Sequence, residues 1–495
     1  MLLFTLAFVL FVVWFINEHV KHRPPGPIRL PFLGNMLQLS QANRKEAFTH
    51  IMLQNWSKQY GPVSSMKFGM LDQILVDDTT LIRDILQSDI WGNRPINEYV
   101  LERSYGKSMG ILWSRGDTNK ELRRFSLRTL RDFGFGKQKS QDAVMEEELR
   151  ELMSRLNSKL ESEGNTVCMQ QFFNISVLNI IWSMVAGVRF NHDDPEFVVL
   201  VANLNATLRL VTATGNIMLA FPFLSSILPK LTGYGEVRKK CIAKFQDLFM
   251  NLLKERRDLG HYKDDQLDYV DVFISEIEKH KNDQLSYIYT DEQFVTTILD
   301  LFAAGSETTS NTLEFSILLM ILHKDVQDKV REEVDRVVGK EKFANFTDKQ
   351  DMPYTEATIL EIMRVSSVVP LIVRTNSEPT TVGSYKLPKE SFVILNTYSA
   401  HRDPKLWNKP DLFNPERFLE NGKVVNADKL IPFGLGKRYC LGEVLARATL
   451  FTYFVTMIQN YTFSKSEDHP QTSLKGIPGL TLSPQKFYAV IKQRT

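Results

Sequence analysis

Cysteine is scarce in this chain, which holds only Cys168, Cys241 and Cys440 among its 495 residues. Three widely spaced thiols cannot form a disulfide framework, so the small disulfide-rich secreted proteins are excluded. Most isolated cysteines are small buried apolar residues, and we interpret Cys168 and Cys241 in this way. Cys440 differs from them because it lies in a glycine-rich segment.

The chain also lacks an excess of charge of one sign. Lys and Arg total 60 against 58 Asp and Glu, which gives a net charge of +2, so we expect no nucleic-acid partner. Residues 36–495 contain no Gly/Ser tract, repeat or low-complexity block, and 43% of the chain is hydrophobic. This composition predicts one large globular domain rather than a disordered or fibrous protein.

The apolar run at residues 2–16 is shorter than the ~20 residues that span a bilayer. A cleaved signal peptide is one interpretation, but no basic residue precedes the run and no small-x-small cleavage site follows it. The basic residues after the run favour an uncleaved anchor, with the rest of the chain in the cytosol. We predict a membrane anchor at residues 1–20, a basic and proline-rich hinge at residues 21–35 that cannot be helical, and a globular domain at residues 36–495.

Long helical patterns dominate the middle of the chain, at residues 145–160, 237–253 and 291–323. The third pattern is apolar nearly all round, which predicts a helix buried in the core. Residues 63–76 have the pattern of a short β region with Gly69 near its turn. We therefore predict a mainly α fold with a minor β region.

In the segment FGLGKRYCLG at residues 433–442, Cys440 opens an amphipathic helical pattern at residues 441–454. Gly434 and Gly436 allow a tight turn and a close approach to a flat ligand. Free N–H groups at the helix start would stabilise a thiolate at Cys440, and Arg438 can reach an anionic group beside it. A plain turn with a buried thiol is the alternative, but the ten-residue pattern is far more specific.

The segment AGSETT at residues 304–309 places polar side chains inside the long apolar pattern, where they are costly unless satisfied. In one interpretation, threonine hydroxyls bond to carbonyl groups one turn earlier. Gly305 costs ~1 kcal/mol relative to alanine inside a helix. A glycine beside the acid Glu307 favours a widened groove that holds a ligand or water. The motif alone leaves both interpretations open.

These segments, in this order, resemble the cytochrome P-450 superfamily, and the resemblance covers nearly the whole chain. The segments PPGP at residues 24–27, KELRRF at residues 120–125 and FGLGKRYCLG are similar to those of the microsomal drug- and hormone-metabolising branch, particularly its invertebrate members. The resemblance implies a haem-thiolate catalytic domain behind the anchor and hinge.

By this resemblance, Cys440 is the thiolate ligand of the iron of haem b, whose electron donation favours O–O cleavage. The implied haem-binding residues are Arg123, Arg374, Arg438, Phe433 and Gly434. The three arginines would pair with haem propionates. Arg94 is a further candidate for this pairing.

Thr308 and Glu307 match the catalytic pair of the family. The Thr308 hydroxyl would help to deliver a proton to dioxygen, and Glu307 would support the proton relay. Gly305 would leave room for dioxygen against the helix.

Glu361 and Arg364, three residues apart, can share one helix face. Most such pairs are surface ion pairs, but flanking apolar residues favour burial here. The resemblance implies that this pair and Arg417 form a structural network that supports folding and haem retention.

One position departs from the family pattern: Asn119 stands four residues before Arg123, where the family usually has a tryptophan that donates to a propionate. This change puts haem affinity on that side in doubt.

Electrons would come from NADPH through NADPH-cytochrome reductase, and cytochrome b5 is a further candidate partner. Lys120, Arg124 and Lys437 would lie on the thiolate side, where an acidic redox partner docks; solvated surface charge is the alternative. The resemblance implies the endoplasmic reticulum membrane, with the catalytic domain facing the cytosol. The apolar residues 199–231 would roof the substrate pocket and contact the membrane.

The implied reaction is insertion of one oxygen atom from O2 into a small lipophilic substrate. A terpenoid or steroid hormone precursor, as in juvenile-hormone-type ester epoxidation, is one substrate class, and broad xenobiotic oxidation is the alternative. A haem-thiolate isomerase or dehydratase needs no dioxygen, so the intact Glu307–Thr308 pair disfavours it. A non-catalytic haem-binding membrane protein is favoured only weakly, by Asn119.

Overall fold

The computed structural model describes residues 9, 11–13, 23–44, 48–134, 138–210, 220–221, 227–228, 235 and 238–494. Helices dominate and strands are short, so the predicted mainly α class with a minor β region is confirmed. Nearly all of the predicted anchor lies outside the described residues. Within the part of the chain that is described, no helix is both long enough and apolar enough to cross a membrane.

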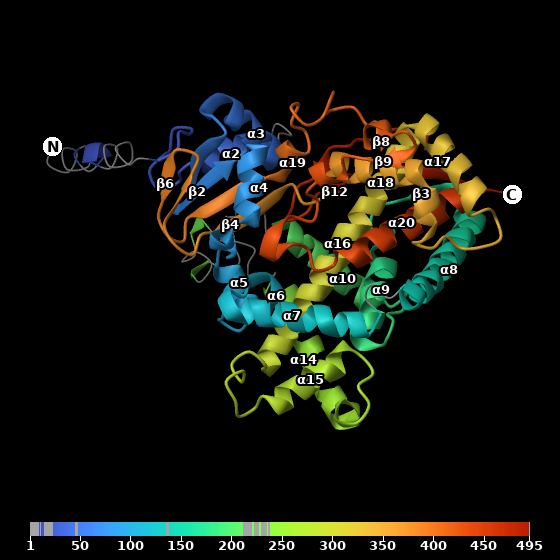
Figure 1. Ribbon diagram of the computed structural model, residues 1–495, viewed down its shortest axis with the longest axis horizontal. Coiled ribbons are helices and arrows are strands. Elements are labelled where there is room, and N and C mark those ends of the chain that lie inside the picture. The colour runs from blue at the N-terminus through green and yellow to red at the C-terminus, as the bar shows by residue number, and fades with distance from the viewer. Residues whose placement is uncertain are drawn as a thin grey trace.

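The largest sheet joins strands from both ends of the chain, as the blue and orange strands of Figure 1 show. Its order is β1 (Val63–Phe68), β2 (Leu71–Val76), β7 (Phe392–Asn396) and β4 (Leu371–Thr375). The β1–β2 hairpin turns at Gly69 and Met70, which confirms the predicted β region. β7 pairs with β2 in parallel and with β4 in antiparallel orientation.

Alternation along these strands gives the sheet two apolar faces. Residues of α4 (Thr79–Gln87) pack with Val76 and Val393 on one face. Residues of α3 (Thr49–Tyr60) pack with Met66 and Ile394 on the other. Successive strand residues point to opposite faces, so the two helices cover opposite sides of the sheet. α2 (Met36–Arg44) and α19 (Thr397–Ala400) lie at the same end of the molecule (Figure 1).

The long helix α16 (Asp291–Leu322) runs through the middle of the helical part (Figure 1). The hydroxyl of Thr290 caps its start by accepting a hydrogen bond from the Gln293 backbone N–H, 3.1 Å away. Most of its side chains are buried, and the buried ones lie on all sides of the helix. This confirms the buried helix predicted at residues 291–323.

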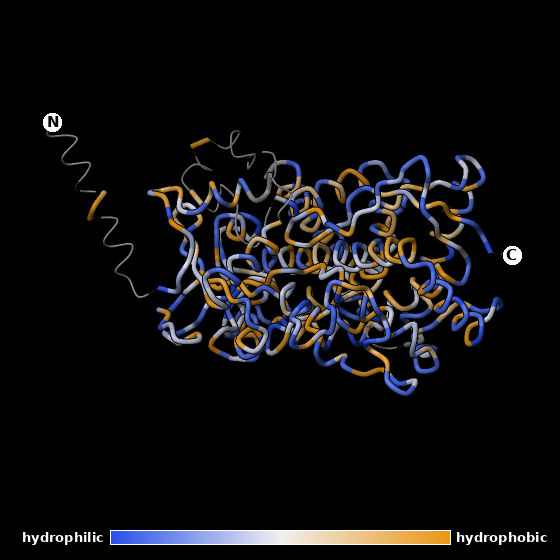
Figure 2. The backbone as a smooth tube through the Cα atoms, turned by 90° about the horizontal axis from the view of Figure 1, so that it is seen from above, coloured by the Kyte–Doolittle hydropathy of each residue, from blue (hydrophilic) through white to orange (hydrophobic). Residues whose placement is uncertain are grey.

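The other helices surround α16, and Figure 2 shows hydrophobic segments gathered in the interior with hydrophilic segments outside. They are α5 (Glu98–Arg103), α6 (Gly110–Trp113), α7 (Gly116–Asp132), α8 (Gln138–Glu163), α9 (Asn174–Ala186), α10 (Pro195–Leu210), α14 (Ala243–Leu259), α15 (Tyr269–Lys279), α17 (Lys324–Val337), α18 (Pro353–Ser366) and α20 (Glu443–Asn460). The predicted helix at residues 145–160 is part of α8. The pattern at residues 237–253 starts in a π-helical turn, Arg238–Ile242, and continues in α14.

Small sheets complete the fold. One joins β10 (Tyr461–Lys465), β13 (Tyr488–Gln493) and β3 (Thr166–Cys168); the others pair β11 (Gly476–Ile477) with β12 (Ser483–Pro484), β5 (Thr380–Val382) with β6 (Tyr385–Leu387), and β8 (Leu419–Glu420) with β9 (Lys423–Val424). Cys241 is buried, as the sequence predicted, whereas Cys168 in β3 is half-buried.

Candidate active site

A cavity of about 310 Å³ lies between α16 and the glycine-rich segment before α20. Ala304, Gly305 and Thr308 of α16 contribute part of its wall, and Cys440 contributes another part. Cys440 lines this cavity and is partly accessible to solvent. The two motifs that the sequence singled out therefore meet at one site.

The cysteine segment folds back on itself as the glycines predicted. Gly434 and Gly436 both have positive φ angles, 73° and 69°. A Cβ atom at Gly436 would lie 2.3 Å from the carbonyl oxygen of Leu86, so only glycine fits there. The backbone N–H of Cys440 donates to the carbonyl oxygen of Phe433 at 2.9 Å, which closes the loop.

The helix after the loop starts later than the sequence pattern suggested. α20 begins at Glu443, with Gly442 as its N-cap residue, so Cys440 precedes the helix instead of opening it. The backbone N–H of Gly442 still donates to the Cys440 sulfur and lowers the pKa of the thiol. Burial has the larger effect, and the pKa lies above its ordinary value. A bound cation would reverse this balance, because metal coordination deprotonates a thiol.

Four arginines, Arg94, Arg123, Arg374 and Arg438, line the same cavity. Burial lowers the pKa of Arg374 well below its usual range, and the other three cations lower it further. Burial and its arginine neighbours lower the pKa of Arg438 to about 9. So much buried positive charge is unfavourable unless an anion accompanies it.

The partners of these arginines within the described chain are mostly backbone carbonyl groups. Arg123 Nη2 donates to the Tyr439 carbonyl oxygen at 2.7 Å, and Arg438 Nε donates to that of Gly92 at 2.6 Å. Among the described residues that line the cavity, Asp300 is the only carboxylate, and it is paired with Arg103 at 2.5 Å. The cavity is therefore built to receive an anionic ligand.

Thr308 lines the cavity, and its hydroxyl donates to the Ala304 carbonyl oxygen at 2.9 Å. Glu307 is buried but does not reach the cavity wall, and its Oε2 accepts a hydrogen bond from the Thr481 hydroxyl at 2.7 Å. A Cβ atom at Gly305 would lie 1.9 Å from Cδ1 of Ile181. Gly305 therefore permits the close crossing of α16 over α9, a packing reason that the sequence did not reveal.

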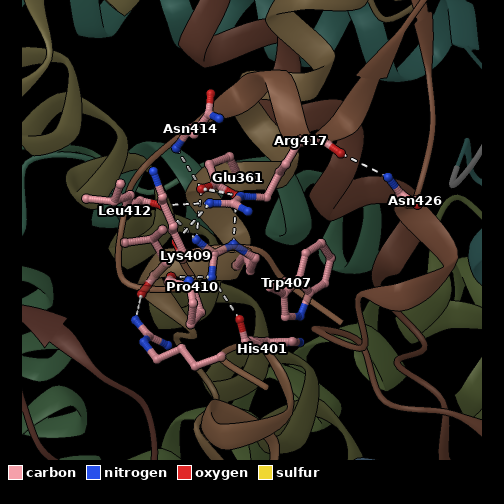
Figure 3. A network of polar contacts seen from close by, with 12 residues as sticks. Glu361, His401, Trp407, Lys409, Pro410, Leu412, Asn414, Arg417 and Asn426 are labelled. Carbon is pink, nitrogen blue, oxygen red and sulfur yellow. Dashed lines mark hydrogen bonds and ion pairs between the residues drawn. The ribbon is translucent and has the colours of Figure 1, made fainter. Parts of the chain in front are cut away.

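Glu361 and Arg364 are buried together in α18. Figure 3 shows the Glu361 side chain among its hydrogen-bond partners. Arg364 Nε and Nη2 donate to the two carboxylate oxygens of Glu361 at 2.7 and 2.8 Å. Arg417 Nε donates to Oε1 at 3.0 Å, and so does the Asn414 backbone N–H at 2.8 Å. The burial that flanking apolar residues predicted is confirmed.

Asn119 is buried but is not among the described residues that line the cavity. Its Nδ2 donates to the Ile111 carbonyl oxygen at 2.7 Å and to Ser114 Oγ at 3.1 Å. Ile111 itself lines the cavity, so Asn119 acts on the site by holding the α6 backbone in place.

His401 also lines the cavity, and sequence reasoning missed it. Its Nε2 accepts a hydrogen bond from the Ile431 backbone N–H at 3.2 Å, and its Nδ1 lies 3.1 Å from Ser367 Oγ. Burial and the nearby Arg402 lower its pKa to about 3, so the imidazole ring is neutral at physiological pH. The ring links Ser367 in the cavity wall to the backbone of Ile431. No local sequence pattern marks His401, because the charged residues Arg402 and Asp403 follow it directly.

The basic residues expected on the thiolate side are exposed. Arg124 pairs with Glu121 at 2.6 Å within α7, and Lys437 pairs with Asp89 at 2.6 Å. Such exposed pairs are weak, so these cations remain available to a docking partner.

The cytochrome P450 family model matches residues 24–491. The chain belongs to this family. It is 32% identical over 493 residues to the farnesoate epoxidase of Bombyx mori, which covers 98% of this chain and 97% of the relative. It is 34% identical over 498 residues to cytochrome P450 2J2 of Homo sapiens, which covers 98% of this chain and 94% of the relative.

Membership in the cytochrome P450 family makes the protein a haem-thiolate monooxygenase that uses O2 and receives electrons from NADPH through a reductase. The described residues fit this cofactor. A haem carries two propionates, and the cavity presents buried arginines that have no ion pair with a carboxylate within the part of the chain that the structure describes. The haem iron of this family also takes a cysteine thiolate as its ligand. Cys440 lies in the cavity wall at the end of a closely packed loop, where it can supply this thiolate.

Proposed function

We propose that Cys440 is the thiolate that binds the haem iron, and that Arg123, Arg374 and Arg438 pair with the haem propionates. The haem supplies the oxygen-activating chemistry when it is bound. Phe433 and Gly434 would pack against it, since both line the cavity beside the thiol. One observation supports this proposal above all: the thiol faces the same cavity as buried arginines whose partners among the described residues are backbone carbonyl groups.

Thr308 and Glu307 are the proposed proton-delivering residues. The Thr308 hydroxyl faces the cavity and can rotate from its carbonyl acceptor to donate into it. Burial raises the pKa of Glu307 to about 6, while Thr481 and Arg209 oppose the rise. A carboxyl group that titrates near neutral pH can both hold and release a proton during turnover.

The proposed substrate is a terpenoid of the farnesoate class, oxidised by epoxidation of a double bond. The farnesoate epoxidase of Bombyx mori supports it, because that relative matches along nearly its whole length. Much of the rest of the cavity wall, with residues such as Val177, Ile181 and Ile372, is apolar and suits a lipophilic chain. Broad oxidation of foreign lipophilic compounds is the alternative, favoured by the similar identity to cytochrome P450 2J2.

A binding screen of the ferric holoenzyme separates these substrate classes. The compounds are farnesoate and its esters, steroids, fatty acids and unrelated drugs. Displacement of the water ligand from ferric iron gives a spectral shift that reports binding. Selective binding of farnesoates, followed by an epoxide product with reductase and NADPH, supports the terpenoid substrate. Equal binding of unrelated drugs would instead support broad oxidation.

Residues 1–20 are the proposed anchor to the endoplasmic reticulum membrane, with the catalytic domain in the cytosol. The family match begins at residue 24, just after this segment. The proline-rich segment packs on the sheet: the Ser65 backbone N–H donates to the Pro25 carbonyl oxygen at 2.8 Å, and Arg29 Nη2 donates to Ser65 Oγ at 2.6 Å. Exposed Ile28 and Phe32 beside this contact, and Ile227 in the apolar region 199–231, suit a lipid surface.

Cytochrome b5 is a second proposed electron donor.

A further inference from the structure

A short loop from the C-terminal part of the chain reaches the acid of the catalytic pair. This Thr481 loop, residues 476–484, is closed by the pairing of β11 with β12. The Thr481 hydroxyl donates to Glu307 Oε2 at 2.7 Å, and both residues are buried. The contact joins residues that are 174 positions apart.

The backbone of the Thr481 loop is fixed on both sides of this contact. The Leu480 N–H donates to the Leu208 carbonyl oxygen of α10 at 2.8 Å, and the Leu482 N–H donates to the Val368 carbonyl oxygen at 2.8 Å. Val368 lines the cavity. The threonine hydroxyl is therefore held at a set place relative to the cavity wall.

Asn311 of α16 ties the loop to the helix that carries Glu307. Its Nδ2 donates to the Leu482 carbonyl oxygen at 3.2 Å and lies 3.5 Å from Thr481 Oγ1. Packing is equally close at Gly479, where a Cβ atom would lie 3.0 Å from the Cα of Arg209. The Thr481 loop cannot move without disturbing α16 or α10.

Three groups act on the Glu307 carboxylate in this setting. The Thr481 hydrogen bond and the positive charge of Arg209 on α10 favour its ionised form, against the effect of burial. Glu314, seven residues later on α16, interacts unfavourably with it when both are charged. Thr481 is the group among them that also fixes where the carboxylate points.

We propose that Thr481 is a positioning residue for oxygen activation, which orients the Glu307 carboxylate and keeps it ready to exchange protons beside Thr308. The inference rests on the proposed role of Glu307 in proton delivery. Without the Thr481 donor, the carboxyl group would lose its fixed orientation and would hold its proton at higher pH. Fewer oxidation cycles would then end in product, and more would release hydrogen peroxide.

Infrared difference spectra of the holoenzyme over a pH series test the contact directly. The variants are Thr481→Val, which keeps the shape but removes the donor, Thr481→Ser, which keeps the donor, and Glu307→Gln, which identifies the carboxyl band. We expect the midpoint of the Glu307 band, near pH 6 in the natural protein, to rise by about one pH unit in Thr481→Val. Thr481→Ser should restore it. An unchanged midpoint in Thr481→Val would overturn the inference.

Turnover with reductase, NADPH and farnesoate as the probe tests the consequence. Thr481→Val should lower product formed per NADPH by about tenfold at neutral pH and raise hydrogen peroxide, because positioned acid–base groups contribute at least that much. Ser483→Ala is the matched control, since Ser483 lies two residues away and its hydroxyl has no hydrogen-bond partner among the described residues. Equal losses in Thr481→Val and Ser483→Ala would reduce Thr481 to a packing residue.

The two arms separate this inference from the proposed function. If the natural protein does not oxidise farnesoate, the substrate proposal fails, and the infrared midpoints still decide whether Thr481 controls Glu307. In that case, peroxide released per NADPH without added substrate replaces the product ratio. If Glu307→Gln forms as much product per NADPH as the natural protein, the proposed role of Glu307 is wrong. The positioning role of Thr481 is then wrong as well.

Discussion

Both carboxylate oxygens of Glu361 accept hydrogen bonds from the guanidinium group of Arg364, at 2.7 and 2.8 Å. Neither side chain has measurable exposure to solvent. Arg364 continues the network by donating to the carbonyl oxygens of His401 and Pro410, both at 2.8 Å (Figure 3). One buried pair thus connects α18 to the segment around His401, which reaches the cavity wall.

Glu361→Leu should prevent stable folding and haem retention. The change leaves the buried Arg364 without its counter-charge, and breaking a buried ion pair typically costs about 3–5 kcal/mol. Haem content after purification and the midpoint of thermal unfolding measure the effect. Lys329→Met is the control, because its pair with Glu416 is exposed and should contribute at most about 1 kcal/mol. Normal haem content in Glu361→Leu would contradict a structural role.

Thr308→Ala should uncouple the enzyme without silencing it. Cys440 and the arginines that line the cavity are untouched, so NADPH consumption should continue, while the hydroxyl that we propose delivers a proton into the cavity is lost. Product per NADPH should fall by ~10²-fold, at the low end for a general acid–base group, because water can replace the hydroxyl in part. Product, NADPH and hydrogen peroxide are measured together. Unchanged coupling would leave Thr308 as a helix-packing residue that bonds only to Ala304.

Glu314 should make stability depend on pH. Burial raises the pKa of Glu314 from 4.5 to about 8. The folded protein therefore binds the Glu314 proton more tightly than the unfolded chain does. This stabilisation is fully present below pH 4.5 and is lost as the pH rises towards 8. The free energy of unfolding should therefore fall by about 1.4 kcal/mol per pH unit in this window. Glu314→Gln should remove that slope.

Denaturant unfolding at about pH 5.5 and about pH 7.5 checks the Glu314 slope. The difference in unfolding free energy between Glu314→Gln and the natural protein should grow with pH. A constant difference would mean that Glu314 does not titrate in this range.

Deletion of residues 1–22 should weaken membrane attachment and leave haem binding intact. Arg23 pairs with Asp72 at 3.0 Å, so the deletion ends just before the first residue with a described contact to the sheet. Binding to lipid vesicles and the spectrum of the bound haem are the two measurements. Some residual binding is expected from the exposed Phe32 and Ile227. Loss of haem in the deleted protein would mean that the haem-binding domain begins before residue 23.

Local patterns predicted the elements that carry the site. Apolar periodicity marked α16 nearly to its ends, and the spacing of Gly434 and Gly436 predicted the turn before Cys440. The start of α20 was wrong by two residues, because an amphipathic pattern does not distinguish the last loop residue from the first helical turn.

Contacts between distant segments could not be predicted in the same way. The parallel pairing of β2 with β7 joins Ile74 to Val393, and the bond from Thr481 to Glu307 spans 174 positions. No local signal encodes such pairings. The packing reason for Gly305 was equally hidden, because it depends on Ile181 in another helix.

The spectrum of the reduced carbon monoxide complex tests the central claim, that Cys440 is the haem ligand, most directly. The natural protein should give the red-shifted band of a thiolate-ligated haem. Cys440→Ser should lose that band, because a hydroxyl is a poorer and less polarisable donor to iron than a thiolate. Cys168→Ser and Cys241→Ser should keep it, since neither residue lines the cavity. A red-shifted band that persists in Cys440→Ser would contradict the account.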